Sequence, residues 1–289
     1  MTTVAPGPLA GAARLRPDGW LTHPLPTDPE TATARISALL RRHHPDAAGP
    51  VRCLTARYRS ATFTVGGPPH TIVKWHADET AYLAERLAYD LLTAERVLPT
   101  LRDSHDGART LLVDYLPDTA NLADPDVFDD LIATVAHVHT ASARWDTTIQ
   151  EAMAPWRVDT AVHGDASWTD DPRAWRRMLR LVAAAHGPGH VPLGNLDLKP
   201  DHVRRDADRP LVLVDVETLR PDVTGLPDVV TLAYLAAHAD HPRPGIRVRG
   251  RYLHHLGQAG ARWADRDLIA ALTGFATATG LASLHGLDS

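Results

Sequence analysis

The sequence contains a single cysteine, Cys53, among 289 residues. One cysteine cannot form an intramolecular disulfide, so the fold cannot depend on such a crosslink. No apolar run approaches the about 18 residues that are typical of a membrane-spanning helix. The first twenty residues also lack the cationic and apolar regions of a signal peptide. These absences predict a protein of the reducing cytoplasm that has no membrane partner.

An excess of positive charge is also missing. The chain has 30 Lys and Arg against 35 Asp and Glu, a net charge of −5, which disfavours a nucleic-acid-binding protein. The acidic excess lies late in the chain: residues 1–116 carry 13 basic and 12 acidic residues, and residues 117–289 carry 17 and 23. An acidic second part would suit a cationic ligand, although such asymmetry is also common on solvated surfaces.

Metal-site motifs are absent despite 17 histidines. The sequence has no His-Glu-x-x-His, and among the paired histidines only His238 and His241 have a spacing that suits ligation from one helix face. We therefore expect solvated or packed histidines rather than a structural zinc site.

The hydrophobic pattern changes along the chain from strand-rich to helix-rich. Residues 1–27 are rich in Pro, Gly and Ala and predict an irregular arm or a peripheral strand. Period-two patterns predict strands, and spacings of three to four residues predict helices. The expected strands are 51–58, 61–65, 70–75, 110–115 and 211–215, and the expected helices are 28–43, 78–96, 127–142, 172–185, 229–238, 252–263 and 265–279. This order predicts an α+β fold.

Two aspartates carry the strongest chemical signal. Asp197 and Asp215 lie 18 positions apart, with a loop and a short apolar strand between them. Phosphoryl transfer needs one carboxylate to orient the attacking hydroxyl and another to hold Mg²⁺ at the nucleotide phosphates. Upstream, Lys74 ends a strand and Glu85 follows on a helix, which is the order expected for a phosphate-binding cation and its ion-pair partner.

These residues lie in segments that resemble the aminoglycoside phosphotransferase and small-molecule kinase group, relatives of the protein kinases. The resemblance covers residues 54–237 and is carried by Leu198-Lys199-Pro200-Asp201-His202 after Asp197, and by the apolar run Leu211-Val212-Leu213-Val214 that leads into Asp215. It implies a bilobal protein-kinase-like fold with a small β-rich N-lobe (1–113), a hinge (114–116) and a larger helical C-lobe (117–289). It also implies transfer of a phosphoryl group from ATP, with Mg²⁺, to an alcohol of a small molecule such as an aminoglycoside or another antibiotic.

The resemblance also assigns further residues. Asp114, Tyr115 and Leu116 would contact the adenine, and His202 stands where the family usually has an Asn that binds the metal. Mg²⁺ prefers oxygen ligands, so His202 is expected to reshape that contact. Apart from the resemblance, three uses of Glu217 are open: it orients Lys199, it contacts substrate, or it is a solvated acid at the end of the strand. Four further acids are candidate contacts for a cationic acceptor: Asp159, Asp165, Asp170 and Asp171.

One departure from the family pattern leaves alternatives open. The turn expected to cover the nucleotide, residues 57–62, contains no glycine, which limits close approach of its backbone to phosphate. Arg57 and Arg59 are candidates to supply charge there instead. This turn and His202 together permit one alternative, a degenerate nucleotide-binding protein that regulates a partner. The other alternative is a metabolic kinase of the same fold that acts on choline, homoserine or a sugar.

Overall fold

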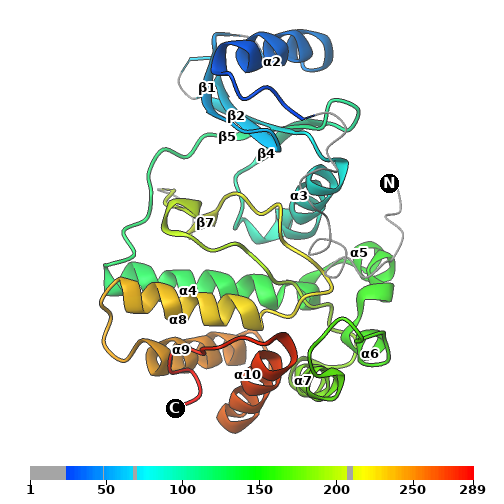
Figure 1. Ribbon diagram of the computed structural model, residues 1–289, viewed down its shortest axis with the longest axis vertical. Coiled ribbons are helices and arrows are strands. Elements are labelled where there is room, and N and C mark those ends of the chain that lie inside the picture. Colours follow the sequence, from blue (N-terminus) through cyan, green and yellow to red (C-terminus); the bar gives the residue numbers. More distant parts are fainter. Residues whose placement is uncertain (1–23, 48, 68–69, 207–210) are drawn as a thin grey trace.

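The computed structural model describes residues 24–47, 49–67, 70–206 and 211–289, and these form two lobes (Figure 1). The smaller lobe holds a β-sheet with two helices, and the larger lobe is mainly helical. The predicted α+β bilobal architecture is confirmed. Residues 1–23 of the predicted N-terminal arm lie outside the described residues, as do Pro68 and Pro69 in the turn before the third strand.

The small lobe is built on a five-stranded antiparallel sheet in the order β1-β2-β3-β5-β4. The strands are β1 (Val51–Ala56), β2 (Ser60–Val65), β3 (Thr71–His76), β4 (Leu101–His105) and β5 (Thr110–Asp114). The middle strand β3 is paired on both sides, so Lys74 lies opposite Thr62 on β2 and Leu111 on β5. This double pairing fixes the direction in which Lys74 points.

Strand β4 was not predicted. Its sequence, Leu-Arg-Asp-Ser-His, has one apolar residue and no period-two pattern. It lies at the edge of the sheet, where polar side chains are tolerated and discourage pairing with other chains. Its formation therefore depends on pairing with β5, which the sequence of β4 itself does not indicate.

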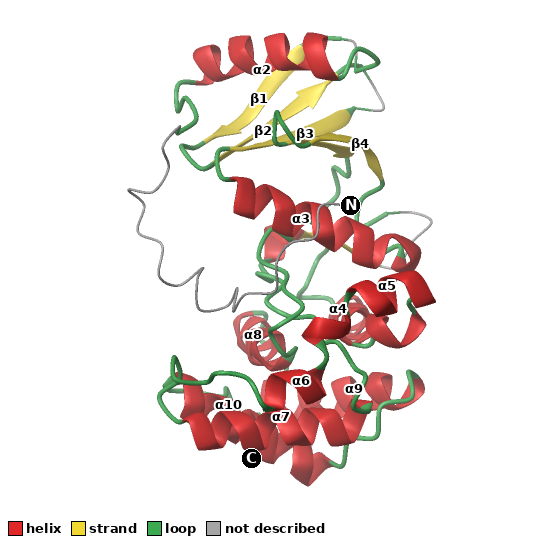
Figure 2. Ribbon diagram, turned by 90° about the vertical axis from the view of Figure 1, so that its right-hand side faces the viewer, coloured by secondary structure: helices red, strands yellow, loops and turns green. Residues whose placement is uncertain are grey.

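Helices cover both faces of the sheet (Figure 2). Helix α2 (Pro29–His43) begins after Asp28, whose side chain accepts the amide of Thr31, and it buries Ile36 and Leu40 in one core with Phe63 and Val73. Burial of each such side chain stabilises the fold by about 1.5–3 kcal/mol. Helix α3 (Glu79–Leu92) lies on the opposite face, between the sheet and the large lobe.

The large lobe holds most of the helices. Its longer helices are α4 (Pro125–His139), α7 (Pro172–His186), α8 (Leu226–His238), α9 (Pro244–Gln258) and α10 (Asp265–Thr279), and its short ones are α5 (Thr147–Ala152) and α6 (Val158–Val162). Helix α9 contacts α4 and α8, and α7 contacts α10. Among the described residues, none of the helices combines the length and apolar character needed to cross a bilayer.

Three predicted boundaries differ from those in the structure. Helix α9 begins at Pro244, not at 252, because a proline at the first helical position starts a helix rather than breaking it. The predicted helix 78–96 ends at Leu92 and continues as a 3₁₀ turn, Thr93–Glu95. The predicted strand 211–215 shrinks to β7 (Val212–Leu213), which pairs with β6 (Val203–Arg204).

Candidate active site

Strand alternation determines where Lys74 points. Val73 and Trp75 are buried against α2, so Lys74 projects from the opposite face toward α3. There Glu85, fully buried on α3, accepts a hydrogen bond from the Lys74 ammonium at 2.6 Å. The structure thus brings together the predicted pair and selects Glu85 over the other glutamates near it.

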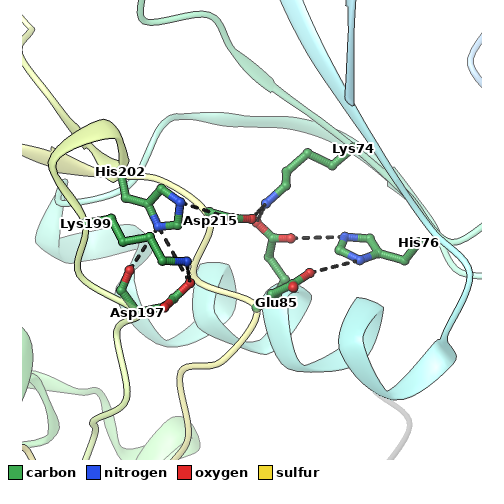
Figure 3. A network of polar contacts seen from close by, with 8 residues as sticks. Lys74, His76, Glu85, Asp197, Lys199, His202 and Asp215 are labelled. Carbon is green, nitrogen blue, oxygen red and sulfur yellow. Dashed lines mark hydrogen bonds and ion pairs between the residues drawn. The ribbon is translucent and has the colours of Figure 1, made fainter. Parts of the chain in front are cut away.

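Asp215 joins this pair from the large lobe. Its Oδ1 atom accepts a second hydrogen bond from Lys74 Nζ at 2.8 Å (Figure 3). Burial opposes charge on all three groups. The two carboxylates nevertheless hold the pKa of Lys74 above its ordinary value, and Lys74 holds the pKa of Glu85 and of Asp215 below theirs. Lys74 is therefore a permanently charged cation at the place where the two lobes meet.

Asp215 owes its orientation to an abrupt change of backbone direction. It has φ +62, in the left-handed region, directly after the short strand β7. Aspartate is one of the few residues other than glycine that enters this region readily. The apolar strand therefore delivers the carboxylate at the turn that ends it.

The segment before Asp197 is held by a buried carboxylate. Asn195 and Asp197 both have left-handed φ angles, +68 and +48. The backbone amides of Asn195 and Leu196 donate to Asp228 on α8 at 2.9 and 2.8 Å. The Oδ2 atom of Asp228, which accepts the Asn195 amide, also lies 3.1 Å from His139 Nε2 on α4. Asp228 thus fixes the backbone of the two residues that precede Asp197.

Close packing at the start of α8 supports this anchor. Gly225 is the residue before α8, and a Cβ there would lie 2.3 Å from the imidazole of His139. Only glycine allows the helix end and the histidine to approach this closely. Tyr252 on α9 contacts the other ring nitrogen, Nδ1, at 2.8 Å, so the ring is held from both sides.

Asp197 and Asp215 face a common position through His202. His202 Nδ1 donates to the backbone oxygen of Asp197 at 2.9 Å, so in the neutral ring the lone pair is on Nε2, which lies 3.4 Å from Asp215 Oδ2. Ligand atoms of all three residues lie within 4.8 Å of one another. Lys199 Nζ lies 2.6 Å from Asp197 Oδ2 and is half exposed.

The chemistry of this cluster suits a divalent cation. Two carboxylates offer the oxygen ligands that Mg²⁺ prefers, and the hydrogen bond at Nδ1 of His202 fixes the tautomer in which Nε2 can bind metal. The Asp197–His202–Asp215 group therefore fits the metal that the sequence analysis expects, with nitrogen replacing one oxygen ligand.

The predicted hinge residues are partly engaged within the small lobe. The amide of Asp114 donates to Thr100 O at 3.0 Å, and that of Tyr115 donates to His70 O at 3.3 Å. The Asp114 carboxylate pairs with Arg102. Neither amide is therefore offered to a ligand, and a ligand at this segment would use carbonyl oxygens or the amide of Leu116.

The hinge also borders a large open cavity of about 760 Å³ that is not the phosphate site. The cavity is lined by Leu112, Asp114 and Tyr115, among others. Leu112 belongs to the core beneath α2, on the sheet face opposite to Lys74. The groups that could bind phosphate therefore lie on the other side of the sheet.

The four acids predicted to contact a cationic acceptor lie around the start of α7. Asp171 caps that helix through the amides of Arg173 and Ala174, and Asp165 accepts from Ser167. Backbone amides are the largest contribution that keeps the pKa of both carboxyls below the ordinary value. At least two of the four thus have local structural partners.

His76 is a site residue that sequence reasoning missed. It lies two positions after Lys74 on β3, hence on the same strand face, and contacts Glu85 at 3.0 Å (Figure 3). The period-two spacing from Lys74 was the available signal. Glu217, for which three uses were open, faces His76 at 3.5 Å rather than Lys199.

Comparisons with known proteins were made for sequence and for structure. No protein-family model and no curated protein sequence matches the chain. Solved structures of similar fold include the macrolide 2′-phosphotransferase MphH from Brachybacterium faecium, with 16% identity, 89% of this chain and 96% of that chain covered and a TM-score of 0.53. A macrolide 2′-phosphotransferase type I shares 17% identity over 91% and 97% of the chains, with a TM-score of 0.53.

An ethanolamine kinase from Plasmodium vivax is also similar, at 11% identity over 90% of this chain and 84% of that chain, with a TM-score of 0.54. Identities this low establish the architecture alone, and that architecture has the two lobes seen here. The chain therefore has the bilobal protein-kinase-like fold that these small-molecule kinases share.

Proposed function

We propose that the protein is an ATP-dependent phosphotransferase that moves the γ-phosphoryl group to a hydroxyl of a small molecule. One observation carries this proposal: Asp197 and Asp215 converge through His202, and Asp215 also meets the Lys74–Glu85 pair. Phosphoryl transfer depends mainly on positioning and charge neutralisation, and this cluster supplies both.

Each residue has a role that follows from its place. Lys74, fixed by Glu85, would bind nucleotide phosphates. Asp215 and His202 would hold Mg²⁺, which when bound neutralises phosphate charge. Asp197 would orient the acceptor hydroxyl and accept its proton, and Lys199, 2.6 Å from Asp197, would offset charge on the transferred group.

For the adenine we propose the 114–116 segment as the hinge between lobes 1–113 and 117–289. Because the amides of Asp114 and Tyr115 are already used, the carbonyl oxygen of Asp114 and the amide of Leu116 are the groups we assign to the base. They are two positions apart, and groups with that spacing face the same side of an extended chain. Tyr115, which is 37% exposed, would pack against it. Use of ATP agrees with a cytoplasmic location.

We propose an antibiotic-like acceptor, such as a macrolide or an aminoglycoside. Two of the similar structures are named as macrolide phosphotransferases, and the acidic second part of the chain would favour an aminated acceptor. The alternative is a metabolic acceptor of the choline, ethanolamine, homoserine or sugar type. The similarity to an ethanolamine kinase supports including that class.

The test is a product assay with purified protein, ATP and Mg²⁺ against macrolides, aminoglycosides, choline, ethanolamine, homoserine and sugars. We expect a phosphorylated product from one class, detected by mass spectrometry, and a loss of at least about 10³-fold in kcat for Asp197→Asn, consistent with loss of a hydroxyl-positioning base. Asp201→Asn is the matched control, because Asp201 lies on the same loop but is exposed.

Two outcomes would contradict the proposal. If Asp197→Asn kept the parent rate, Asp197 would not serve the acceptor. If Mg·ATP stabilised the protein against heat but no acceptor was phosphorylated, a nucleotide-binding regulator would be the better account.

A further inference from the structure

His76 is a buried ring that lies between carboxylates from two different segments. It is the last residue of β3 and has no exposed surface. Its Nε2 lies 3.0 Å from Glu85 Oε2 on α3, and its Nδ1 lies 3.5 Å from Glu217 Oε2 in the loop after β7. One side chain thus connects both lobes.

The Glu85 carboxylate is divided between two partners. Its Oε1 accepts from Lys74 at 2.6 Å, and its Oε2 faces His76. Within the described residues, neither ring nitrogen nor Glu85 Oε2 makes a regular hydrogen bond, so these are close polar contacts. Removing the ring would leave Glu85 Oε2 buried without its contact to His76.

Glu217 lies near other acids, because it follows Asp215 by two positions. Lys74 contacts Asp215 and Glu85. The partner that the structure gives Glu217 is His76, whose Nδ1 lies 3.5 Å from Glu217 Oε2.

His76, Glu85 and Glu217 also have the composition of a metal site, since their ligand atoms lie within 4.8 Å of one another. The geometry favours a bridge through the two nitrogens of the ring. The closest contacts of Glu85 and Glu217 are to different nitrogens of the His76 ring, whereas a metal binds a single ring nitrogen and gathers the carboxylates around it.

We propose that His76 is a positioning residue for phosphoryl transfer, which holds Glu85 and Glu217 together and so ties Lys74 to the segment that carries Asp215. This inference rests on the proposed kinase function. Because Lys74 would serve the nucleotide, loss of the bridge should weaken nucleotide use and leave acceptor binding unchanged.

The experiment compares His76→Gln, Glu217→Gln and the double variant, with His105→Gln as control. His105 lies at the β4–β5 turn, where its ring accepts the amide of Ala108. For His76→Gln we expect a KM for ATP raised about tenfold, from partial loss of a charge-assisted contact, and a KM for the acceptor within twofold of the parent. The control should retain the parent values.

Thermal unfolding without nucleotide tests the bridge independently of catalysis. We expect His76→Gln to lower Tm by about 2–6 °C and Glu217→Gln to add less than about 1 °C on that background, since the two residues share one contact. If no acceptor is phosphorylated, the kinase proposal fails. The Tm values of the single and double variants and the Kd of ATP then still decide the role of His76.

Three results would overturn the inference. The first is additive Tm losses in the double variant. The second is an equal rise in both KM values, which would indicate general damage. The third is a rise in Tm on adding Zn²⁺ alone to chelator-treated protein that disappears in His76→Gln, since that would show a metal site.

Discussion

The Oδ1 atom of Asp228 accepts the backbone amide of Leu196 at 2.8 Å. The other oxygen accepts the amide of Asn195 and also contacts His139. Two peptide groups directly before Asp197 are therefore fixed by one buried side chain. Because Asn195 and Asp197 have left-handed φ angles, this part of the chain depends on an external anchor more than a regular strand would.

We predict that Asp228→Asn lowers kcat about 10- to 100-fold and destabilises the fold by about 1–3 kcal/mol. Asparagine keeps the shape but has one accepting oxygen, so one of the two amides loses its partner. Urea unfolding and steady-state kinetics would measure both effects. Asp130→Asn on the exposed face of α4 is the control, and an Asp228→Asn variant with parent kinetics would disprove the anchoring role.

Tyr252 extends this anchor. Its hydroxyl contacts His139 Nδ1 at 2.8 Å, and as the donor it leaves the ring proton on Nε2, where it faces Asp228. We predict that Tyr252→Phe costs about 1 kcal/mol of stability and lowers kcat less than Asp228→Asn does, because the amide contacts survive. A kcat loss larger than that of Asp228→Asn would show that Tyr252 acts by another route.

The nitrogen ligand that His202 offers leads to a prediction about metal preference. Nitrogen ligands favour Mn²⁺ over Mg²⁺ more than amide oxygens do. We expect the parent to have a higher ratio of Mn²⁺- to Mg²⁺-supported kcat/KM than His202→Asn, by about threefold or more. Titrations with each metal at fixed ATP would measure it. An unchanged ratio would mean that His202 only orients Asp197 through its backbone contact.

The sequence was enough to place the residues of this cluster in their elements because the signals there are local. Lys74 ends a β-rich run, and Asp215 ends an apolar run. The position of each charged group therefore follows from the strand that precedes it. The structure brings Lys74, Glu85 and Asp215 into direct contact, and His202 links Asp215 to Asp197.

What could not be predicted depends on partners distant in sequence. Strand β4 forms because β5 pairs with it, and nothing in its five residues indicates this. The anchoring role of Asp228 has no local signal, because its partners at 195 and 196 are 32 or more positions away. His76 became a site residue only when Glu217 was placed beside it.

Acid should weaken the large lobe through two stacked histidines. The rings of His186 and His190 lie 4.2 Å apart, with Trp263 donating to His186 and Ser142 contacting His190. Burial, with a smaller effect from His139, lowers the pKa of His186 from 6.5 to about 4. Burial likewise lowers the pKa of His190. The His186 ring is therefore neutral in the folded protein at pH 5, while the same residue is protonated in the unfolded chain.

The direction of the pH effect on the free energy of unfolding follows from proton uptake by the unfolded chain. Between pH 6.5 and 4 the unfolded state binds more protons at His186, so the free energy of unfolding falls as pH falls through this window and is insensitive to this residue above about pH 7.5. Urea unfolding at pH 7.5 and 5.0 should show a loss in the parent that exceeds the loss in His186→Gln by about 2 kcal/mol. His238→Gln, an exposed histidine on α8, should retain the parent's pH dependence. The same loss in His186→Gln as in the parent would place the acid sensitivity in carboxylates instead.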